Sequence, residues 1–236
     1  MSDIEISQDV LDKLLIPSTA TLTAQLSRLG LWNTFMHDVR PLKLDMKMAG
    51  PAFTMRYIPA REDLDRIPMD NLTDVQRVGI EQIGAGEILV IDAREDTHAG
   101  TMGNILATRI HCRGAAGIVT DGAYRDSPAI AGIGIPAYAR AMNANTNKTI
   151  HHPIDIQLPV ACGGVSVYPG DIIVGDDEGV VVVPREYAVE VAEQGVEQEQ
   201  KEAFILHKIE QGASIIGTYP ADEKTLAEFE EWKKSR

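Results

Sequence analysis

The short sequence GEILVIDA, at residues 86–93, constrains the fold more than any other feature of the chain. It is almost entirely apolar, a pattern typical of a strand that is covered on both faces of its sheet. A segment with apolar residues at helical spacing follows at 101–113, and AGIVTD at 116–121 predicts a further buried strand. Strands that alternate with helices in this way predict a mixed α/β domain built in layers.

The rest of the 236 residues extends this pattern without a visible repeat, low-complexity tract or linker. We therefore expect a single domain, 1–236, with a core at about 15–184 and a helical tail at about 185–236. Helices are predicted at 8–29 (with a break at Pro17-Ser18-Thr19), 101–113, 126–134, 185–210 and 222–234; strands are predicted at 48–58, 86–93 and 116–121 and within 135–140, 158–167 and 170–184.

Two short polar sequences are expected to form turns. Asp121-Gly122 ends the predicted strand at 116–121, and this dipeptide is a common turn signal. Asp176-Asp177-Glu178 is expected to be a solvated turn before GVVVVP, with binding of an adventitious cation as the alternative.

Composition narrows the range of partners. The formal net charge is −13 and no basic run is present, so nucleic acid is not an expected partner. No apolar run reaches membrane-spanning length, and the N-terminal sequence lacks the basic start and apolar run of a secretory signal. We expect no membrane association and a cytoplasmic protein. Cys112 and Cys162 are far apart in the sequence, which favours reduced structural cysteines over a disulfide.

The first candidate site is the adjacent pair Arg125-Asp126, just after a predicted strand. Open α/β sheets bind ligands at the carboxyl ends of their strands. A carboxylate there suits Mg²⁺ or Mn²⁺, and a guanidinium suits a substrate carboxylate or a developing enolate. The alternative is that Asp126-Ser127-Pro128 simply starts a helix, with Arg125 in solvent.

The second candidate is the start of the helix at 101–113, with Thr101 as the expected cap. The free N–H groups of Gly103, Asn104, Ile105 and Leu106 then form an anion site, because unpaired amides and the helix dipole both favour negative charge. An ordinary capped helix is the alternative.

The third candidate is Glu199, which the helical spacing places on the apolar face of a long helix. A carboxylate there is costly unless it is paired or faces a ligand. Either this helix contributes Glu199 to a neighbouring subunit, with Glu202 as a second choice, or the apolar face is slightly shifted and Glu199 lies at its edge. The predicted face comprises Ala188, Ala192, Val196, Glu199, Ala203 and Leu206.

The order of several sequence blocks resembles one family, that of the regulator of ribonuclease activity A and the 4-hydroxy-4-methyl-2-oxoglutarate / 4-carboxy-4-hydroxy-2-oxoadipate aldolases. The resemblance covers residues 15–210. The matching blocks are AGPAFT, MGNILA, GIVTDGAYRD, LPVACGGVSVYPGDIIVGDDEGVVVVP and EQEQKE.

The resemblance implies a layered α/β/β/α fold with a barrel-like mixed sheet and C-terminal helices, assembled as a homotrimer or a dimer of trimers. It implies that Asp126 holds a divalent metal, Mg²⁺ or Mn²⁺, and that Arg125 holds the pyruvoyl oxygen of a 2-oxo acid. The amides from Gly103 to Leu106 would receive its carboxylate. Glu199 of an adjacent subunit would complete the site.

Of the departures from the family pattern, which include the opening TATLTAQL and a longer tail after Gly212, the one at Asn104 bears on the chemistry. Asn104 follows the helix-start glycine, where the aldolases commonly have Asp or Glu. An amide cannot take up a proton, so retro-aldol cleavage, which needs a base for the C4 hydroxyl, is expected to suffer more than oxaloacetate-type decarboxylation. The resulting prediction is a carbon–carbon lyase that passes through a pyruvate enolate, with Asn104 and Glu199 holding the relay water. The alternative is a non-catalytic, protein-binding regulator of a ribonuclease.

Overall fold

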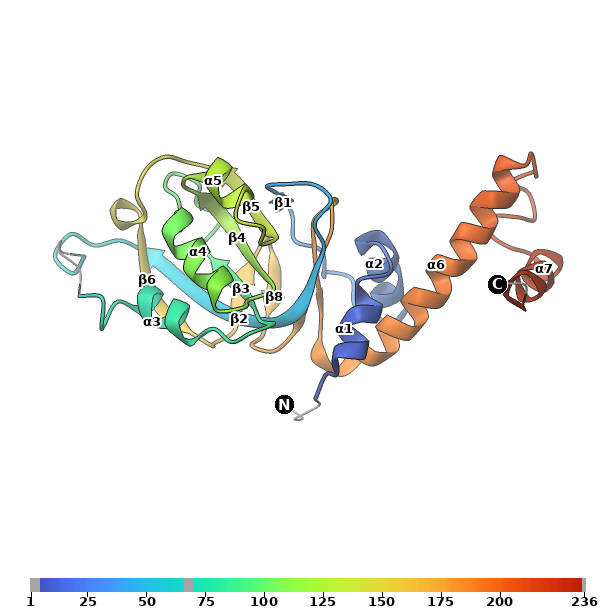
Figure 1. Cartoon of the computed structure of the whole chain (residues 1–236), viewed down its shortest axis with the longest axis horizontal. Coiled ribbons are helices and arrows are strands. Elements are labelled where there is room, and N and C mark those ends of the chain that lie inside the picture. The colour runs from blue at the N-terminus through green and yellow to red at the C-terminus, as the bar shows by residue number, and fades with distance from the viewer. Residues whose placement is uncertain (1–4, 66–69, 235–236) are drawn as a thin grey trace.

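The computed structural model describes residues 5–65 and 70–234, and the larger of its two sheets is an eight-stranded mixed sheet (Figure 1). Its strands follow the order β1-β5-β4-β3-β2-β9-β10, with β6 paired to β2. They are β1 (Arg40–Pro41), β2 (Met48–Pro59), β3 (Ile88–Asp92), β4 (Gly117–Tyr124), β5 (Ala137–Met142), β6 (His151–Ile156), β9 (Ile172–Gly175) and β10 (Val180–Val183). The strands from β2 to β5 are parallel to one another, and the remaining pairings are antiparallel.

The long strand β2 bends the sheet into a nearly closed barrel. Its first residues, 48–51, pair with β9, its middle pairs with β3, and its last residues, 55–59, pair with β6. Inside the curve lies the β7–β8 hairpin (Val160–Cys162 and Val165–Val167), whose apolar side chains join those of β3, β9 and β10 in one core.

The alternation of side chains along β3 explains why its sequence is apolar throughout. Ile88 and Val90 face the barrel interior, whereas Leu89 and Ile91 face a helical layer. That layer comprises α3 (Val75–Gln82), α4 (Asn104–Cys112) and α5 (Ser127–Ala131). The covered strand predicted at 86–93 is thus confirmed.

A second helical layer packs on β9 and β10 from the opposite side. It consists of α1 (Gln8–Leu14), α2 (Thr19–Arg28) and the first half of α6 (Ala188–Glu210). The α/β/β/α order is therefore confirmed, and Figure 1 shows the two helical layers on opposite sides of the sheet. In the described part of the chain, no helix is both long and apolar enough to cross a membrane.

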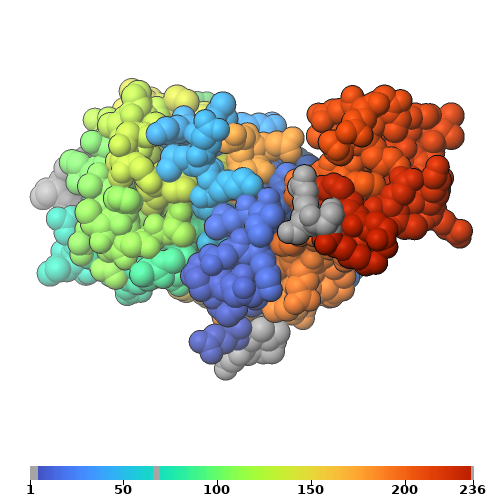
Figure 2. Space-filling model, turned by 45° about the vertical axis from the view of Figure 1, so that its right-hand side comes forward, coloured from blue at the N-terminus to red at the C-terminus, as the bar shows by residue number. Residues whose placement is uncertain are grey.

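The C-terminal half of α6 projects from this body and carries α7 (Glu223–Lys234) at its far end, as Figures 1 and 2 show. Phe204 and Ile205 are buried against Phe229 of α7, whereas Leu206 is 58% exposed. The apolar face predicted for this helix is therefore wrong beyond Glu199, because α7 covers a different side of it. The two helices themselves lie where the sequence predicts them.

Asp121-Gly122 does not form the predicted turn, because β4 continues through both residues to Tyr124. Asp121 is buried, and its carboxylate accepts N–H groups from Ala93 (2.7 Å), Glu95 (3.3 Å) and Gly163 (3.4 Å). Burial raises the pKa of this carboxyl to about 6. Gly122 is required by close packing, since a Cβ there would lie 2.7 Å from Cβ of Ala93. Tertiary contacts therefore override the local turn signal.

The turn at Asp176-Asp177-Glu178 lies between β9 and β10 as predicted, but its first residue is not solvated. Asp176 is buried and accepts hydrogen bonds from the backbone N–H and the hydroxyl of Thr19, both at 2.8 Å. This carboxylate attaches the start of α2 to the sheet. Cys112 and Cys162 are both free, as expected.

Candidate functional site

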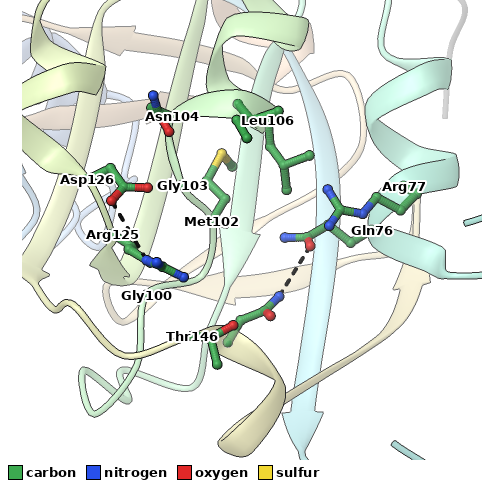
Figure 3. A pocket seen from close by; sticks show the side chains of 12 residues that line it. Gln76, Arg77, Gly100, Met102, Gly103, Asn104, Leu106, Arg125, Asp126 and Thr146 are labelled. Carbon is green, nitrogen blue, oxygen red and sulfur yellow. Dashed lines mark hydrogen bonds and ion pairs between the residues drawn. The ribbon is translucent and has the colours of Figure 1, made fainter. Parts of the chain in front are cut away.

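A pocket of about 260 Å³ lies beside the carboxyl ends of the parallel strands (Figure 3). Its lining comes from segments that follow β2, β3, β4 and β5 in the sequence, which is where ligands bind in open α/β sheets. The lining residues are Gln76, Arg77, Gly100, Met102, Gly103, Asn104, Ile105, Leu106, Arg125, Asp126, Thr146 and Asn147.

Arg125 and Asp126 directly follow β4 and reach this pocket from one side. The backbone N–H of Arg125 donates to the carbonyl of Met102 (2.9 Å), which ties the end of β4 to the segment before α4. Gly100 permits this approach, because a Cβ there would lie 2.6 Å from the Arg125 nitrogen. Arg125 Nε lies 3.7 Å from Asp126 Oδ1, and both side chains are about half exposed.

Asp126 has a left-handed backbone, with φ of 56°, and immediately precedes α5. Its carboxylate makes no capping hydrogen bond to that helix, so the structure does not support a plain capping role. Asp126 Oδ2 instead lies against Gly103, where an added Cβ would be 2.7 Å away. A glycine at 103 therefore lets the carboxylate lie next to the start of α4.

The helix start is also in the pocket, but its first residue differs from the prediction. α4 begins at Asn104 with Gly103 as its N-cap, and no side chain caps it. Thr101 is not the cap, because it is buried and its hydroxyl donates to the carbonyl of Ala123. The amides of the first helical turn lack intrahelical partners and lie beside the Arg125-Asp126 pair, an arrangement that can hold a carboxylate.

Glu199 is not part of this pocket within one chain. It lies on α6, where its Oε2 accepts a hydrogen bond from the hydroxyl of Thr21 (3.0 Å) and one from the N–H of Ser18 (3.3 Å). Glu202, the second choice, is bonded to Gln198 on the same helix. The contribution of Glu199 to a neighbouring subunit stays a prediction.

Among the residues that the structure describes, Asp126 is also the one acidic side chain that lines the pocket. No group of three or more His, Cys, Asp or Glu residues within 5–65 and 70–234 can hold a metal ion. The half-exposed carboxylate of Asp126 fits Mg²⁺ or Mn²⁺, which keep several waters and need few protein oxygens. It does not fit a metal that requires a set of nitrogen or sulfur ligands.

The opposite wall of the pocket is formed by α3 and the segment after β5, and neither was predicted from the sequence as part of a site. Gln76 is buried there; its Nε2 donates to Tyr57 Oη (2.6 Å) and to the carbonyl of Thr101 (2.7 Å). Asn147 Nδ2 donates to Gln76 Oε1 (3.2 Å), so the two parts of this wall belong to one hydrogen-bond network. Asp74 before α3, followed by apolar residues at helical spacing, was the available signal for this element.

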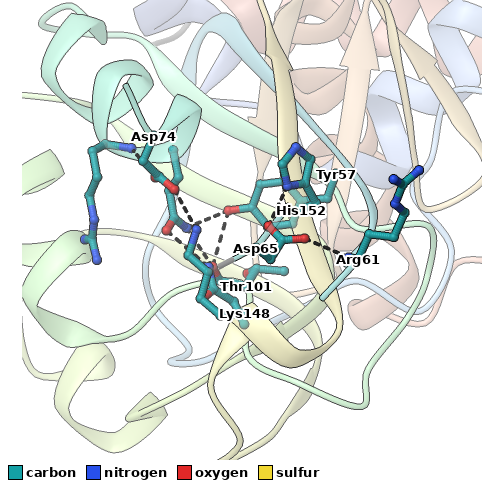
Figure 4. Close-up of polar contacts among 10 residues, drawn as sticks. Tyr57, Arg61, Asp65, Asp74, Thr101, Lys148 and His152 are labelled. Atoms are coloured by element: carbon teal, nitrogen blue, oxygen red, sulfur yellow. Dashed lines mark hydrogen bonds and ion pairs between the residues drawn. The ribbon is translucent and has the colours of Figure 1, made fainter. Parts of the chain in front are cut away.

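One ion pair and one histidine–carboxylate contact lie beside the same wall (Figure 4). Lys148 Nζ lies 2.6 Å from Asp74 Oδ2, and both side chains are nearly buried. His152 Nδ1 lies 2.6 Å from Asp65 Oδ1, which attaches the segment after β2 to β6. The histidine is thus held by a carboxylate outside the pocket lining.

Comparison with known proteins agrees with the fold. The family model RraA-like, described as Aldolase/RraA, matches residues 9–182. A protein of Halalkalibacterium halodurans named "Putative 4-hydroxy-4-methyl-2-oxoglutarate aldolase" is 31% identical over 156 residues, which cover 66% of this chain and 68% of that protein. Protein DlpA of Legionella pneumophila is 26% identical over 218 residues, which cover 88% of this chain and 32% of DlpA. The chain thus spans about a third of the length of DlpA.

Solved structures agree as well. RraAS2 of Streptomyces coelicolor, described as an unusual member of the RNase ES inhibitor RraA protein family, is 31% identical, with a TM-score of 0.77 over 86% of this chain and 98% of that one. An uncharacterized protein of Pseudomonas syringae pv. tomato has a TM-score of 0.83 at 24% identity, over 94% of this chain and 98% of that one, and supports the fold alone. Because the family model matches most of the chain, the protein belongs to the RraA-like family, which includes a protein named as an aldolase and a member of an RNase-inhibitor family.

Proposed function

We propose that the protein is a divalent-metal-dependent carbon–carbon lyase that releases pyruvate from a 2-oxo acid. One observation carries this proposal: Arg125, Asp126 and the uncapped start of α4 line one small pocket. A guanidinium, a hard oxygen ligand and a set of free amides are the groups that a 2-oxo acid and its enolate require. The 31% identity to a protein named as an aldolase supports the same activity.

In this proposal each group has a separate task. The amides of residues 103–106 hold the carboxylate of the substrate, and Arg125 donates to the oxygen on C2. Asp126 would hold the cation, which when bound supplies Lewis-acid polarisation of the keto group. When the C3–C4 bond breaks, its electron pair stays on the pyruvoyl half, and Arg125 stabilises the enolate oxygen that results.

Proton transfer is the step for which the pocket lacks an evident base, because position 104 is an asparagine. Retro-aldol cleavage must remove the proton of the C4 hydroxyl and later protonate C3, whereas decarboxylation of oxaloacetate needs only the second transfer. Asn104 cannot act as a base. We infer that Glu199 of a neighbouring copy, in a trimer or a dimer of trimers, holds the water that carries these protons.

The test is pyruvate release. The purified protein is incubated with Mg²⁺ or Mn²⁺ and 4-hydroxy-4-methyl-2-oxoglutarate, 4-hydroxy-2-oxopentanoate or oxaloacetate. We expect pyruvate from at least one of them, with loss of activity on chelation and a decrease of at least roughly a hundredfold in Asp126→Ala. Asp177→Ala, which removes an exposed carboxylate outside this pocket, is the matched control. Activity that survives both chelation and Asp126→Ala would contradict the proposal.

A second candidate function is a ribonuclease regulator that acts by contact. RraAS2, at 31% identity, belongs to an RNase-inhibitor family, and the charge of −13 suits competition for basic, RNA-binding segments. Inhibition of a ribonuclease by both the wild-type protein and Asp126→Ala, with no pyruvate released by either, would favour this function over the lyase.

A further inference from the structure

The pocket contains a second arginine for which the proposed chemistry has no task. Arg77 lies in the first turn of α3, and Figure 3 shows its side chain entering the pocket from the side opposite Arg125 and Asp126. It is partly buried, and its Nε is buried without a hydrogen-bond partner in the described structure. An unpaired guanidinium nitrogen in such a position is costly unless a ligand satisfies it.

The two carboxylates that α3 could offer to Arg77 are both engaged elsewhere. Asp74 accepts the backbone N–H of Arg77 on Oδ1 (3.1 Å) and pairs with Lys148 through Oδ2 (2.6 Å). Glu81, one turn further along the helix, binds Arg109 through both oxygens (2.9 and 2.7 Å) and also lies 3.5 Å from Arg113. Within the described residues, the guanidinium of Arg77 therefore has no counter-ion.

Hydrogen bonds of neighbouring residues fix the backbone position of Arg77. The preceding residue, Gln76, is held by Tyr57, Thr101 and Asn147, and Asp74 caps the helix from which Arg77 extends. A guanidinium on a fixed backbone is suited to bidentate binding of a carboxylate, because little ordering is needed when the ligand arrives. In a chain with a net charge of −13, a pocket with two arginines and one aspartate is locally positive.

We propose that Arg77 binds an anionic group at the end of the substrate remote from its 2-oxo carboxylate. The preferred ligand is then a 2-oxo acid with a second carboxylate. The orientation of this ligand rests on the proposed function, in which Arg125 and the start of α4 hold the pyruvoyl end. Arg77 receives the other end across the pocket, and selects the ligand by charge.

The test uses two ligands that differ at one group and cannot undergo retro-aldol cleavage because they lack a C4 hydroxyl. These are 2-oxoglutarate and 2-oxopentanoate, which have the same chain length and carry a carboxylate or a methyl group at the far end. Dissociation constants are measured by calorimetry in Mg²⁺. The wild-type protein is expected to bind 2-oxoglutarate more tightly by roughly tenfold or more, the range for a charge-assisted contact.

Three variants test whether Arg77 causes the preference for 2-oxoglutarate over 2-oxopentanoate. Arg77→Gln should lose the preference by weakening 2-oxoglutarate alone, and Arg77→Lys should keep part of it. Arg56→Gln, which removes an arginine that is paired with Asp155 outside the pocket, should leave it unchanged. Thermal unfolding establishes that all three variants are folded.

Three results would overturn the proposal: no measurable binding of 2-oxoglutarate, no preference in the wild-type protein, or an equal loss for both ligands in Arg77→Gln. Because the assay measures binding, it separates two failures. Absence of pyruvate release would refute the lyase and leave the role of Arg77 standing. Pyruvate release with an unchanged preference in Arg77→Gln would refute the role of Arg77 alone.

Discussion

Asp126 combines two constraints at a single position. Its backbone is left-handed, which costs about 1 kcal/mol or more for a residue other than glycine. Its carboxylate nevertheless forms no cap and instead lies against Gly103. Strain of this kind persists only where the surroundings impose it, and it is common at ligand-binding sites. Asp126 is for this reason a stronger candidate than its place in a turn sequence suggests.

Asn104 permits a test of the proton relay. We expect Asn104→Asp to raise the rate of retro-aldol cleavage relative to oxaloacetate decarboxylation by roughly tenfold or more, because a carboxylate can serve as a base for the C4 hydroxyl. Both activities are measured as pyruvate release. Asn71→Asp adds the same charge at an exposed position outside the pocket and should not change the ratio. An unchanged ratio in Asn104→Asp would refute this explanation.

Asp121 predicts a dependence of stability on pH. Burial, with a contribution from the neighbouring Asp92, raises the pKa of this carboxyl from 3.8 in the unfolded chain to about 6 in the folded protein. The protonated form is thus favoured by folding, so its stabilising contribution is complete below pH 4 and is lost as the pH rises through 6. The loss is on the order of 3 kcal/mol, since one pKa unit corresponds to about 1.4 kcal/mol.

The measurement is the free energy of unfolding of the wild-type protein and of Asp121→Asn, from pH 4 to pH 7. We expect the difference between the two proteins to shift against the wild type as the pH rises, because asparagine does not titrate. Parallel curves would show that the pKa of Asp121 is not raised in the folded protein.

Two elements, α4 and β4, contribute to the candidate site with the residues at their ends. The end of β4 supplies Arg125 and Asp126, and the start of α4 supplies the free amides, with glycines where the two backbones approach each other. The hydrogen bond from the Arg125 N–H to the Met102 carbonyl holds the two elements together. Small residues at these contacts therefore determine where the functional groups lie.

Gly103→Ala tests this dependence. The backbone at 103 has φ of −115°, which alanine can adopt, but the new Cβ would lie 2.7 Å from Asp126 Oδ2 and displace the carboxylate. We expect pyruvate release to fall by roughly tenfold to a hundredfold, because small displacements of reacting groups are costly. Gly132→Ala, where the nearest atom is 3.4 Å away, should retain activity. Equal activity of the two variants would contradict this role of Gly103.

At the scale of the whole molecule, the projecting tail exposes apolar side chains that no contact within the described part of the single chain covers. Several large apolar residues of the tail are exposed, and a groove on α6 includes Glu199 beside them. Exposed apolar groups clustered in this way are typical of an interface. They are Leu206, Ile215, Ile216 and Tyr219. This arrangement supports the proposal that Glu199 acts in the site of another copy.

Subunit mixing tests this proposal. Asp126→Ala lacks the proposed metal ligand and Glu199→Gln lacks the proposed partner carboxylate, so each variant alone should be nearly inactive. Oligomers that contain both variants should regain activity, because a pocket with an intact Asp126 then meets an intact Glu199 from the other chain. A mixture of Asp126→Ala with Arg125→Gln leaves every pocket defective and is the control. Glu199 does not act between subunits if the first mixture gains no more activity than the second.

Much of the fold and part of the site could be predicted, because their signals are local. The covered strand at 86–93 and the helices at 185–210 and 222–234 depend on side-chain periodicity over a few residues. Arg125 and Asp126 are adjacent in the sequence, and the start of α4 contains its own glycine. Such local features can be predicted without knowing which distant segments they contact.

The remaining features depend on residues that are distant in the sequence. Asp121 reads as a turn, yet it is buried in β4 because an N–H group from Gly163 and others from the end of β3 converge on its carboxylate. Arg77 has no counter-ion within the described part of the chain, because Lys148 and Arg109 bind the acidic residues of its helix. By itself the sequence determined most of the elements and the adjacent pair Arg125-Asp126. Only the tertiary structure decided which carboxylates are buried and which charges stay free, because burial and pairing depend on contacts between distant segments.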